Sequence, residues 1–412
     1  MTGDPAQQDA PAAAEPSTGE PSGSARVQQA VQAMFSSSWV ITVGAVLLAL
    51  VIGSILILIG DQDVQETTGY FFSRPSDFFV EAWRAISQSY LALFQGAIYD
   101  NQASSASRAI RPLTETLTIS APLILAGLGI GLGFRAGLFN IGGQSQMVLG
   151  AVFGTYLGFA YHLPVFVHIT VVMVGTALGG ALAGAMPGFL KARFGAHEVI
   201  TTIMLNNVST YFLLWLLTTS VFASSTPQVS KPLDETARLG LMLGSDFRLH
   251  IGFLLALVAA LAVWLLMERS VLGFHMRSVG SNADAARTAG MSVGRVTIAA
   301  MAISGALCGL AGGMQVAGTE GQLTTSVAGS IGFDAITVAL LGRSRPMGTV
   351  LAGLLFGALA AGGRLMAARA GTEAELVMVL QSLIVLLIAA PPLVRAVFRL
   401  PEPRIRAKEV AA

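Results

Sequence analysis

Residues 133–148 read GFRAGLFNIGGQSQMV, a polar and glycine-rich stretch between two long apolar segments. Four glycines and two glutamines here interrupt hydrophobic sequence that would otherwise continue as a helix. Broken backbone at membrane depth is tolerated only inside protein or beside a cavity. The stretch therefore predicts a helix break, although a plain glycine-rich inner turn fits the same pattern. Its amide side chains, Asn140, Gln144 and Gln146, offer donors and acceptors either to a polar solute or to the freed backbone.

Composition places this stretch in a membrane protein. The chain has 412 residues, of which 53% are hydrophobic and only 11% are charged, and its mean hydropathy is +0.68. Soluble domains carry about 25% charged residues. The net charge of +1 creates no strong field toward nucleic acid, so we expect no nucleic-acid partner.

Ten apolar runs follow one another along the chain. Most reach the roughly twenty residues that a lipid bilayer requires, and a spanning backbone must satisfy its own hydrogen bonds as a helix. We therefore expect an all-α polytopic membrane protein with about ten transmembrane segments, including short or broken helices. The run IGFDAITVALLG is too short to cross alone and predicts a half-helix or part of a broken one. The ten runs are 39–60, 112–133, 144–162, 164–190, 198–222, 249–267, 297–318, 331–342, 347–363 and 375–397.

The runs define a transmembrane domain at 39–397 between two tails. Residues 1–38 predict a disordered cytoplasmic tail that lacks the basic start of a secretory leader, and residues 398–412 form a basic tail. With both termini inside, fifteen of the 24 Lys and Arg residues fall in inner segments, as expected for cytoplasmic loops. The 61–110 loop then lies outside, and its piece DFFVEAWRAISQSYLALF predicts a helix along the membrane surface.

The sequence carries few groups suited to catalysis or metal binding. None of its three lysines lies in a P-loop, so the chain has no ATP site of that kind. The five histidines lack the i, i+4 spacing of a helical metal site, and the single cysteine, Cys308, excludes an internal disulfide. We expect no enzyme activity, metal or cofactor. Ionisable residues lie only near the ends of the apolar runs, which disfavours a proton-coupled secondary transporter without excluding sodium coupling.

A polar stripe marks the run EVITTIMLNNVST, residues 198–210. Glu198, Thr202, Asn206 and Ser209 recur at helical spacing and therefore share one face. Such a face avoids lipid and meets protein or water. Two interpretations stay open, namely hydrogen bonds between helices and the lining of a solute pathway.

An inner loop at 268–296 contains NADAARTAGM, an Ala-rich stretch that predicts a short helix. Asn282 or Ser281 suits its N-cap, and Gly290 suits its C-terminal stop. The small residues favour close packing in a groove on another protein, although an ordinary solvated loop helix fits the same pattern.

The stretch NADAARTAGM also resembles the coupling loop of bacterial ABC-importer permeases, in which a short helix docks on the ATPase subunit. The similarity extends through FRAGLFNIGGQSQMVLGA (134–151), HEVITTIMLNN (197–207) and GFDAITVALLGRSRPMGTVLAG (332–353). Together these motifs cover most of residues 112–395 and resemble the branched-chain amino acid, ribose and nucleoside permease family. Within it, the chain is most similar to the longer permease of nucleoside and simple-sugar importers that use a basic-membrane-protein-type receptor.

This resemblance implies a helix arrangement of the vitamin B12 importer type and transport of nucleosides, or alternatively of simple sugars or branched-chain amino acids. The implied partners in the bacterial plasma membrane are an ABC ATPase subunit, a second and shorter permease, a substrate-binding lipoprotein and a small polar solute. The residues assigned to the substrate pathway are Asn140, Gln144, Gln146, Glu198, Thr202 and Asn206. The residues assigned to ATPase coupling are Asn282, Ala285, Ala286 and Gly290.

Overall fold

The computed structural model describes residues 38–371, 374–390, 393 and 396–397. Within this part of the chain the regular elements are helices, as predicted, and extended pairing is limited to three isolated bridges. The two predicted tails lie outside the described residues, apart from Ser38.

The helices follow the predicted apolar runs in order. In the first half they are α2 (Ser38–Gly60), α3 (Gln62–Thr68), α4 (Pro75–Ala97), α5 (Ala106–Arg135), α6 (Gly143–Ala160), α7 (Val165–Phe194) and α8 (Glu198–Leu216). In the second half they are η1 (Glu235–Ala237), α9 (Gly252–Arg269), α10 (Val271–Ser281), α11 (Ala283–Thr288), α12 (Val293–Met314), the π-helix η2 (Gln315–Glu320), α13 (Ile331–Leu341), α14 (Pro346–Ala370) and α15 (Ala374–Ala389).

Six helices in the described part of the chain are long and apolar enough to cross a membrane: α5, α7, α8, α9, α12 continued by η2, and α14. The number rises to seven if α2 and α3, which meet at a bend of 74°, form one broken span. α13 is apolar but short, as the sequence predicts. Helix length and composition therefore support a polytopic membrane protein, but they do not reproduce the expected ten crossings.

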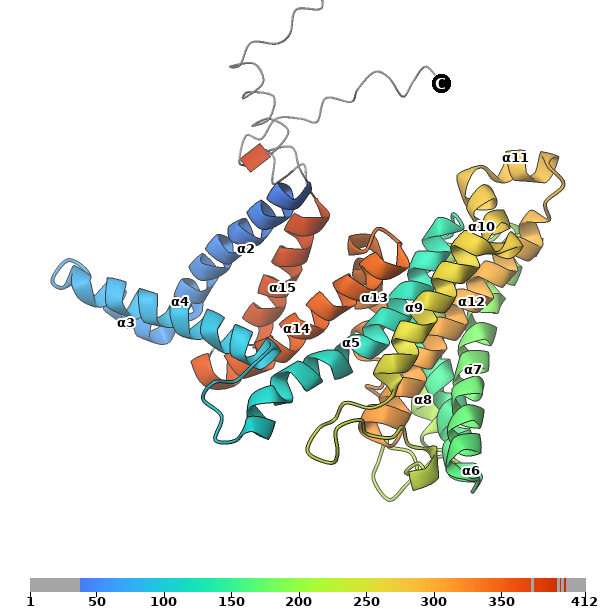
Figure 1. The fold of residues 1–412 in the computed structure, drawn as a ribbon, viewed down its shortest axis with the longest axis horizontal. Coiled ribbons are helices and arrows are strands. Elements are labelled where there is room, and N and C mark those ends of the chain that lie inside the picture. The colour runs from blue at the N-terminus through green and yellow to red at the C-terminus, as the bar shows by residue number, and fades with distance from the viewer. Residues whose placement is uncertain (1–37, 372–373, 391–392, 394–395, 398–412) are drawn as a thin grey trace, which may run out of the picture.

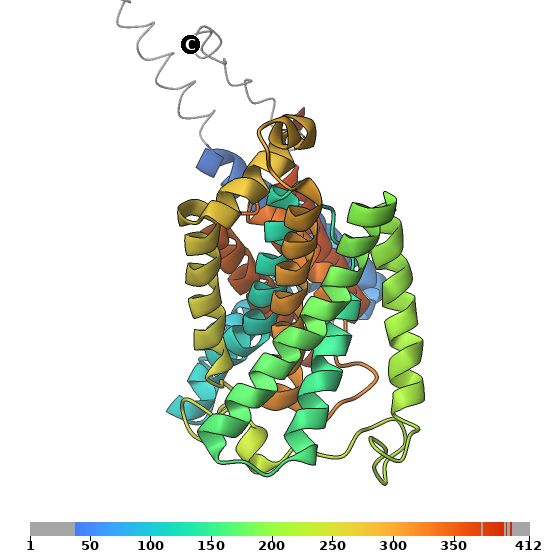
Figure 2. The ribbon, with the colours of Figure 1, turned by 90° about the vertical axis from the view of Figure 1, so that its right-hand side faces the viewer.

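The main core is built around α5 and α12, with α7 packed along α12 (Figures 1 and 2). The backbones of α7 and α12 approach so closely that side chains are excluded. A Cβ placed on Gly180 would lie 2.2 Å from the carbonyl oxygen of Gly305, and one placed on Gly309 would lie 2.3 Å from that of Thr176. Small residues allow this close packing where lipid provides no hydrophobic drive for helix association.

The bundle has two distinct ends (Figure 1). α10 and α11 project from one, which we call the α11 end. The segment 217–251 closes the other, which we call the loop end (Figure 2). α5 runs between them. It begins at the loop end, and the carbonyl of its last residue, Arg135, lies beside Gly280 of α10.

A smaller core joins the N-terminal helices to the C-terminal ones. α2 lies beside α15, and α4 packs on α14 (Figure 1). At the loop end of α14, the Arg369 guanidinium donates to both carboxylate oxygens of Asp100, at 2.9 and 2.6 Å, and to Gln95 Oε1 at 2.8 Å. This paired, charge-assisted contact lowers the pKa of Asp100 and fixes the end of α4 to α14.

Candidate functional site

The predicted helix break is confirmed. α5 ends at Arg135 and α6 begins at Gly143. Gly137 adopts a φ of 72°, in the left-handed region that glycine enters without strain. Asn140, in the middle of the break, is fully buried, whereas Gly137 and Phe139 are exposed, so only part of this non-helical backbone lies inside the protein.

A network of buried amides stabilises the break. Asn140 Nδ2 donates to Gln146 Oε1 at 3.0 Å, and Gln146 Nε2 donates back to Asn140 Oδ1 at 3.1 Å. Asn140 also donates to Ser304 Oγ on α12 at 2.8 Å and accepts from the Gly142 N–H at 2.9 Å. The break is therefore bonded to itself, to α6 and to the central helix α12.

The polar stripe of α8 faces the protein, with Glu198, Thr202, Asn206 and Ser209 all buried. Asn206 Oδ1 accepts from the Ser145 N–H at 3.0 Å, and Asn206 Nδ2 donates to the Ile141 carbonyl at 3.0 Å. The Ser145 N–H lies in the first turn of α6, where backbone donors have no partner within their helix. Asn206 thus joins α8 to α6 by completing that turn.

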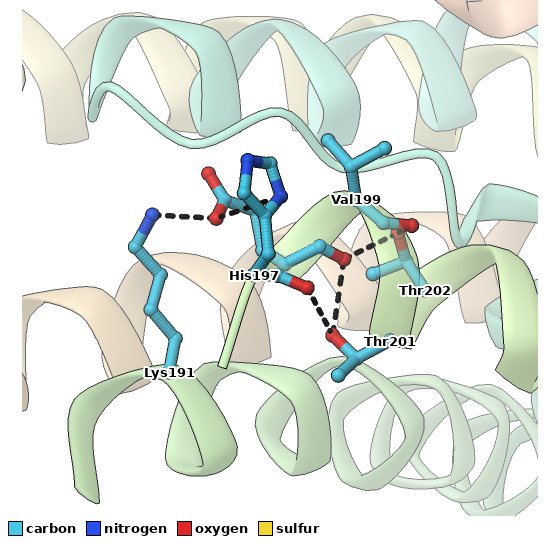
Figure 3. Close-up of polar contacts among 6 residues, drawn as sticks. Lys191, His197, Val199, Thr201 and Thr202 are labelled. Carbon is cyan, nitrogen blue, oxygen red and sulfur yellow. Dashed lines mark hydrogen bonds and ion pairs between the residues drawn. The ribbon is translucent and has the colours of Figure 1, made fainter. Parts of the chain in front are cut away.

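The start of α8 carries a buried carboxylate, Glu198 (Figure 3). Lys191 Nζ donates to its Oε2 at 2.6 Å, and His197 Nδ1 lies 3.9 Å from the same oxygen. The hydroxyls of Thr201 and Thr202 donate to the Glu198 carbonyl at 3.0 and 2.7 Å. The ion pair offsets the buried charge and fixes the turn between α7 and α8.

Five of the six predicted pathway residues therefore form these contacts within the chain, and the sixth, Gln144, points toward α13. Its Nε2 donates to the Gly329 carbonyl at 3.1 Å, while its Oε1 has no partner among the described residues. Of the two interpretations left open by the sequence, these contacts favour bonding between helices and to the freed backbone. A role for the six residues in lining the solute pathway stays a prediction.

We expect Asn206→Leu to destabilise the protein, because it leaves the Ser145 N–H and the Ile141 carbonyl buried without partners. Each such group costs about 1–3 kcal/mol. Asn207→Leu is the matched control, since Asn207 is exposed and donates only within its own helix, to Ile203 at 3.3 Å. Thermal unfolding of both variants in detergent measures the difference. Unchanged stability of Asn206→Leu together with lost uptake would instead support the pathway role.

A cavity of about 690 Å³ lies between α5, η2, α13, α14 and α15, and Arg248 of the segment 217–251 contributes to its wall. Sites for small molecules commonly have volumes of about 300–1,000 Å³. Two acidic residues, Glu115 and Asp334, and two basic residues, Arg248 and Arg364, line it. Glu115 Oε2 lies 3.4 Å from Arg248 Nη1. The neutral polar residues of its wall are Thr118, Gln315, Thr319, Ser330, Gln381 and Ser382. The other lining residues are apolar or glycine, so the wall combines balanced charges and polar groups with apolar surface, which suits an uncharged molecule with polar groups.

The sequence indicated only part of this cavity. Glu115 and Asp334 are recognisable as acids near the ends of apolar runs, and Gln381 and Ser382 are adjacent polar residues inside one. Arg248 comes from a loop and Arg364 from the interior of α14, and neither belongs to a motif. Only the packing of five helices and the loop that carries Arg248 brings these residues together.

A buried histidine, His250, follows the cavity-lining Arg248 by two residues in the sequence. His250 is 1% exposed, its Nδ1 accepts from the Gly252 N–H at 3.2 Å, and its Nε2 has no partner among the described residues. Burial, assisted by the charge of Arg248, lowers the pKa of His250 to about 4. The imidazole is therefore neutral at pH 7.

We expect stability to fall on acidification because of His250. Its pKa drops from 6.5 to about 4 on folding, so its contribution is fully present above pH 6.5 and is lost as pH decreases toward 4. The loss reaches about 3 kcal/mol. Thermal unfolding between these pH values measures it, and His250→Gln should flatten the profile. An identical pH profile in parent and variant would show that other groups control acid sensitivity.

The projection at the α11 end has the predicted helix caps. Asn282 Oδ1 accepts from the N–H groups of Asp284 and Ala285, at 3.0 Å each, and is the N-cap of α11. Gly290 has a φ of 82°, which confirms the predicted stop. Ala285 and Gly290 are exposed, whereas Ala286 is buried beneath the helix. The outward surface of α11 therefore includes only part of the predicted small-residue set.

A hollow of about 480 Å³ lies between α10 and α11, with Phe274, Ser278 and Ala285 among its lining residues. Its position at the tip of the projection leaves it open to another protein. Phe274 is 52% exposed there, which provides an apolar contact surface.

α10 is in turn held against the α5–α6 break. Arg135 Nη2 lies 2.7 Å from Oε1 of Glu268, at the end of α9, and Arg277 Nη1 on α10 lies 3.9 Å from Oε2 of the same glutamate. A Cβ on Gly280 would lie 2.4 Å from the Arg135 carbonyl, so the end of α10 touches the break at backbone distance. A displacement of α10 and α11 would therefore act directly on the break and its amide network.

These features together define a membrane transport subunit: a bundle of apolar helices, a cavity with polar and charged groups in its wall at one end, and a capped two-helix projection at the other. The family described as branched-chain amino acid transport system / permease component matches residues 113–389, and the chain belongs to this family. The match begins in α5 and ends with α15, so it includes the cavity, the break and the projection.

Three curated relatives are similar to this chain over most of its length. The guanosine ABC transporter permease protein NupP of Bacillus subtilis is 36% identical over 76% of this chain and 88% of its own. The glucose ABC transporter permease protein TsgB13 of Haloferax volcanii is 35% identical, over 66% of this chain and 75% of its own. The nucleoside ABC transporter permease protein NupB of Lactococcus lactis is 33% identical, over 71% and 82%.

Proposed function

We propose that this chain is the permease subunit of an ATP-driven importer that carries nucleosides across the bacterial plasma membrane. The observation that carries the proposal is the family match across residues 113–389, within which lie both the solute-sized cavity and the capped projection. The chain has no P-loop, so the energy is supplied by a separate ABC ATPase subunit.

The α11 end is the docking site of that ATPase. Its support is the short capped helix, the hollow beside it and the exposed Ala285 and Gly290. Force applied to α11 passes through α10, and the contacts of Arg135 and Gly280 transmit it to the α5–α6 break. The amide network then carries the movement to α6, α8 and α12. Through this movement of the α5–α6 break, closure of the ATPase on ATP binding would change access to the solute path.

The α11 end is accordingly cytoplasmic, and the loop end is outside, as are the cavity and α4. Both termini lie inside, with about ten crossings arranged as in the vitamin B12 importer type. The crossings beyond those found by helix length come from α2, α6, α13 and α15, which are shorter, bent or less apolar.

A second, shorter permease and a substrate-binding lipoprotein complete the importer. The outward face of α8 supports the first partner, because Asn207 and Tyr211 are exposed on a membrane-spanning helix. Polar side chains at such positions call for protein or a water-filled path rather than lipid. The lipoprotein delivers solute to the loop end, where the cavity opens.

Nucleosides are the favoured solute because two relatives carry guanosine or nucleoside in their names and because the cavity suits a neutral, polar molecule. Simple sugars are the alternative, which the glucose relative supports. Branched-chain amino acids come third, and a secondary transporter fourth. The α10–α11 projection argues against a secondary transporter, which has no ATPase to dock.

Competition for uptake tests the solute class. Cells that express the complete importer should accumulate labelled guanosine, and unlabelled adenosine or uridine should compete more strongly than glucose or leucine. Preferential competition by glucose would replace the nucleoside assignment with a sugar one. Preferential competition by leucine would replace it with an amino acid assignment.

A further inference from the structure

α4 has three faces of different character. The face that packs on α14 and its neighbours consists of small or polar residues: Ala82, Ala85, Ser89, Ala92, Gln95 and Gly96. A Cβ on Gly96 would lie 2.6 Å from Leu365 Cβ and 3.0 Å from Gly362 Cα, so α4 and α14 are in close contact. The large apolar residues of α4 must therefore point elsewhere.

The second face is apolar and exposed. Phe79, Trp83, Leu91 and Phe94 recur along one side of the helix with exposed fractions of 63, 73, 48 and 58%. Phe72, just before the helix, is 99% exposed. Large side chains outside and alanines inside reverse the pattern of a surface helix in water. A contiguous exposed apolar surface of this kind marks a contact with membrane or protein.

The third face is charged and lies beside the apolar one. Asp77, Glu81, Arg84 and Gln88 follow each other at intervals of three or four residues, so they form one strip along α4. Arg84 Nε lies 2.6 Å from Glu81 Oε2, and Arg84 also pairs with Asp63 on α3. The charged strip is thus continuous with the acidic helix α3.

The position of α4 explains these faces. Figure 1 shows α4 running across the direction of α2, α9 and α12 rather than along it. Its C-terminal end is fixed beside the start of α5 and the end of α14, at the loop end, by the Asp100–Arg369 pair. A helix that lies flat at the level where spans end meets a planar boundary between lipid and water. A helix at such a boundary has an apolar strip facing the lipid and a charged strip facing the water, side by side along its length, as α4 has.

We propose that α4 is an interfacial helix embedded in the outer leaflet of the bilayer. Trp83 and the phenylalanines occupy the boundary of headgroups and acyl chains, where aromatic residues are enriched. Asp77, Glu81 and Arg84 face the aqueous side. The small-residue face holds the loop end of α14, which lines the cavity, so the lipid contact of α4 fixes one wall of that cavity. This goes beyond the proposed function, because it assigns a lipid-binding surface outside the solute path.

Site-directed spin labelling of the assembled importer in lipid vesicles tests the proposal. The native Cys308 is fully buried, and burial keeps it unreactive, so a cysteine introduced on α4 is labelled selectively in this chain before assembly. Trp83→Cys reports on the apolar face, and Gln88→Cys reports on the charged strip. Molecular oxygen, which partitions into lipid, and a nickel chelate, which stays in water, serve as relaxation agents.

We expect the label at residue 83 to be more accessible to oxygen than to the nickel chelate, and the label at residue 88 to show the opposite preference. Equal access of nickel to both labels would place α4 in water and overturn the proposal. Exclusion of both agents from residue 83 would show that a partner subunit covers the apolar face, which also overturns it. A double mutant with Cys308→Ser verifies that the signals come from the introduced cysteines.

Discussion

Gly290→Glu is expected to abolish uptake while leaving the permease in the membrane. The substitution places a large charged side chain on the exposed tip of the ATPase-docking projection. It also removes the residue that adopts a φ of 82° without strain. A left-handed conformation costs a non-glycine residue about 1–2 kcal/mol. This cost is local and lies outside the bilayer, so the bundle should fold. Co-purification of the ATPase and uptake of labelled guanosine measure the effect.

Gly195→Glu is the matched control for this variant. Gly195 ends α7 with a φ of 67°, and, as at Gly290, a Cβ there would meet no described atom within 4 Å. The same charge and strain are therefore introduced outside α10 and α11. Gly290→Asn should retain much of the activity, because asparagine tolerates the left-handed region. Normal ATPase retention by Gly290→Glu would show that α11 is not the docking site.

Ala367→Trp is the second change expected to have a large effect. Ala367 lies on α14 and lines the cavity near Arg364. An indole at this position occupies space that the account assigns to the solute, so uptake should fall to background. The ATPase should still co-purify, because the α11 end is untouched. Binding of the ATPase and uptake, measured on the same preparation, separate the two sites.

Ala368→Trp adds the same side chain one residue further along α14. Ala368 is exposed and does not line the cavity. This variant should transport like the parent. Equal uptake by both tryptophan variants would mean that solute does not pass through this cavity.

Much of the fold follows from local sequence. Apolar runs predicted the helices, the glycines and amides of residues 137–146 predicted a break, and Asn282 and Gly290 predicted the limits of α11. These features depend on interactions between residues that are a few positions apart, so the local sequence is enough to indicate them. The number of crossings was less predictable, because helix length and composition in the described residues support six or seven spans, and neither α6 nor the short α13 is among them.

The candidate site was less accessible to sequence reasoning. Periodicity correctly placed Asn206 on a polar face, but its partners, Ser145 and Ile141, lie more than sixty residues earlier in the chain. A polar stripe at helical spacing has the same pattern whether it faces solute or another helix. The cavity residues Arg248 and Arg364 come from separate segments, so their proximity depends on tertiary packing.

Reconstitution in vesicles tests whether this chain is the permease subunit of an ATP-driven importer. Vesicles that contain this permease, its partner permease and the ATPase are supplied with receptor-bound labelled guanosine on the outer side. We expect accumulation only when the ATPase and hydrolysable ATP are both present. We also expect no ATP hydrolysis by this chain alone, since the sequence contains no P-loop. ATP-independent accumulation by this chain alone, driven by a proton or sodium gradient, would show that the chain is a secondary transporter.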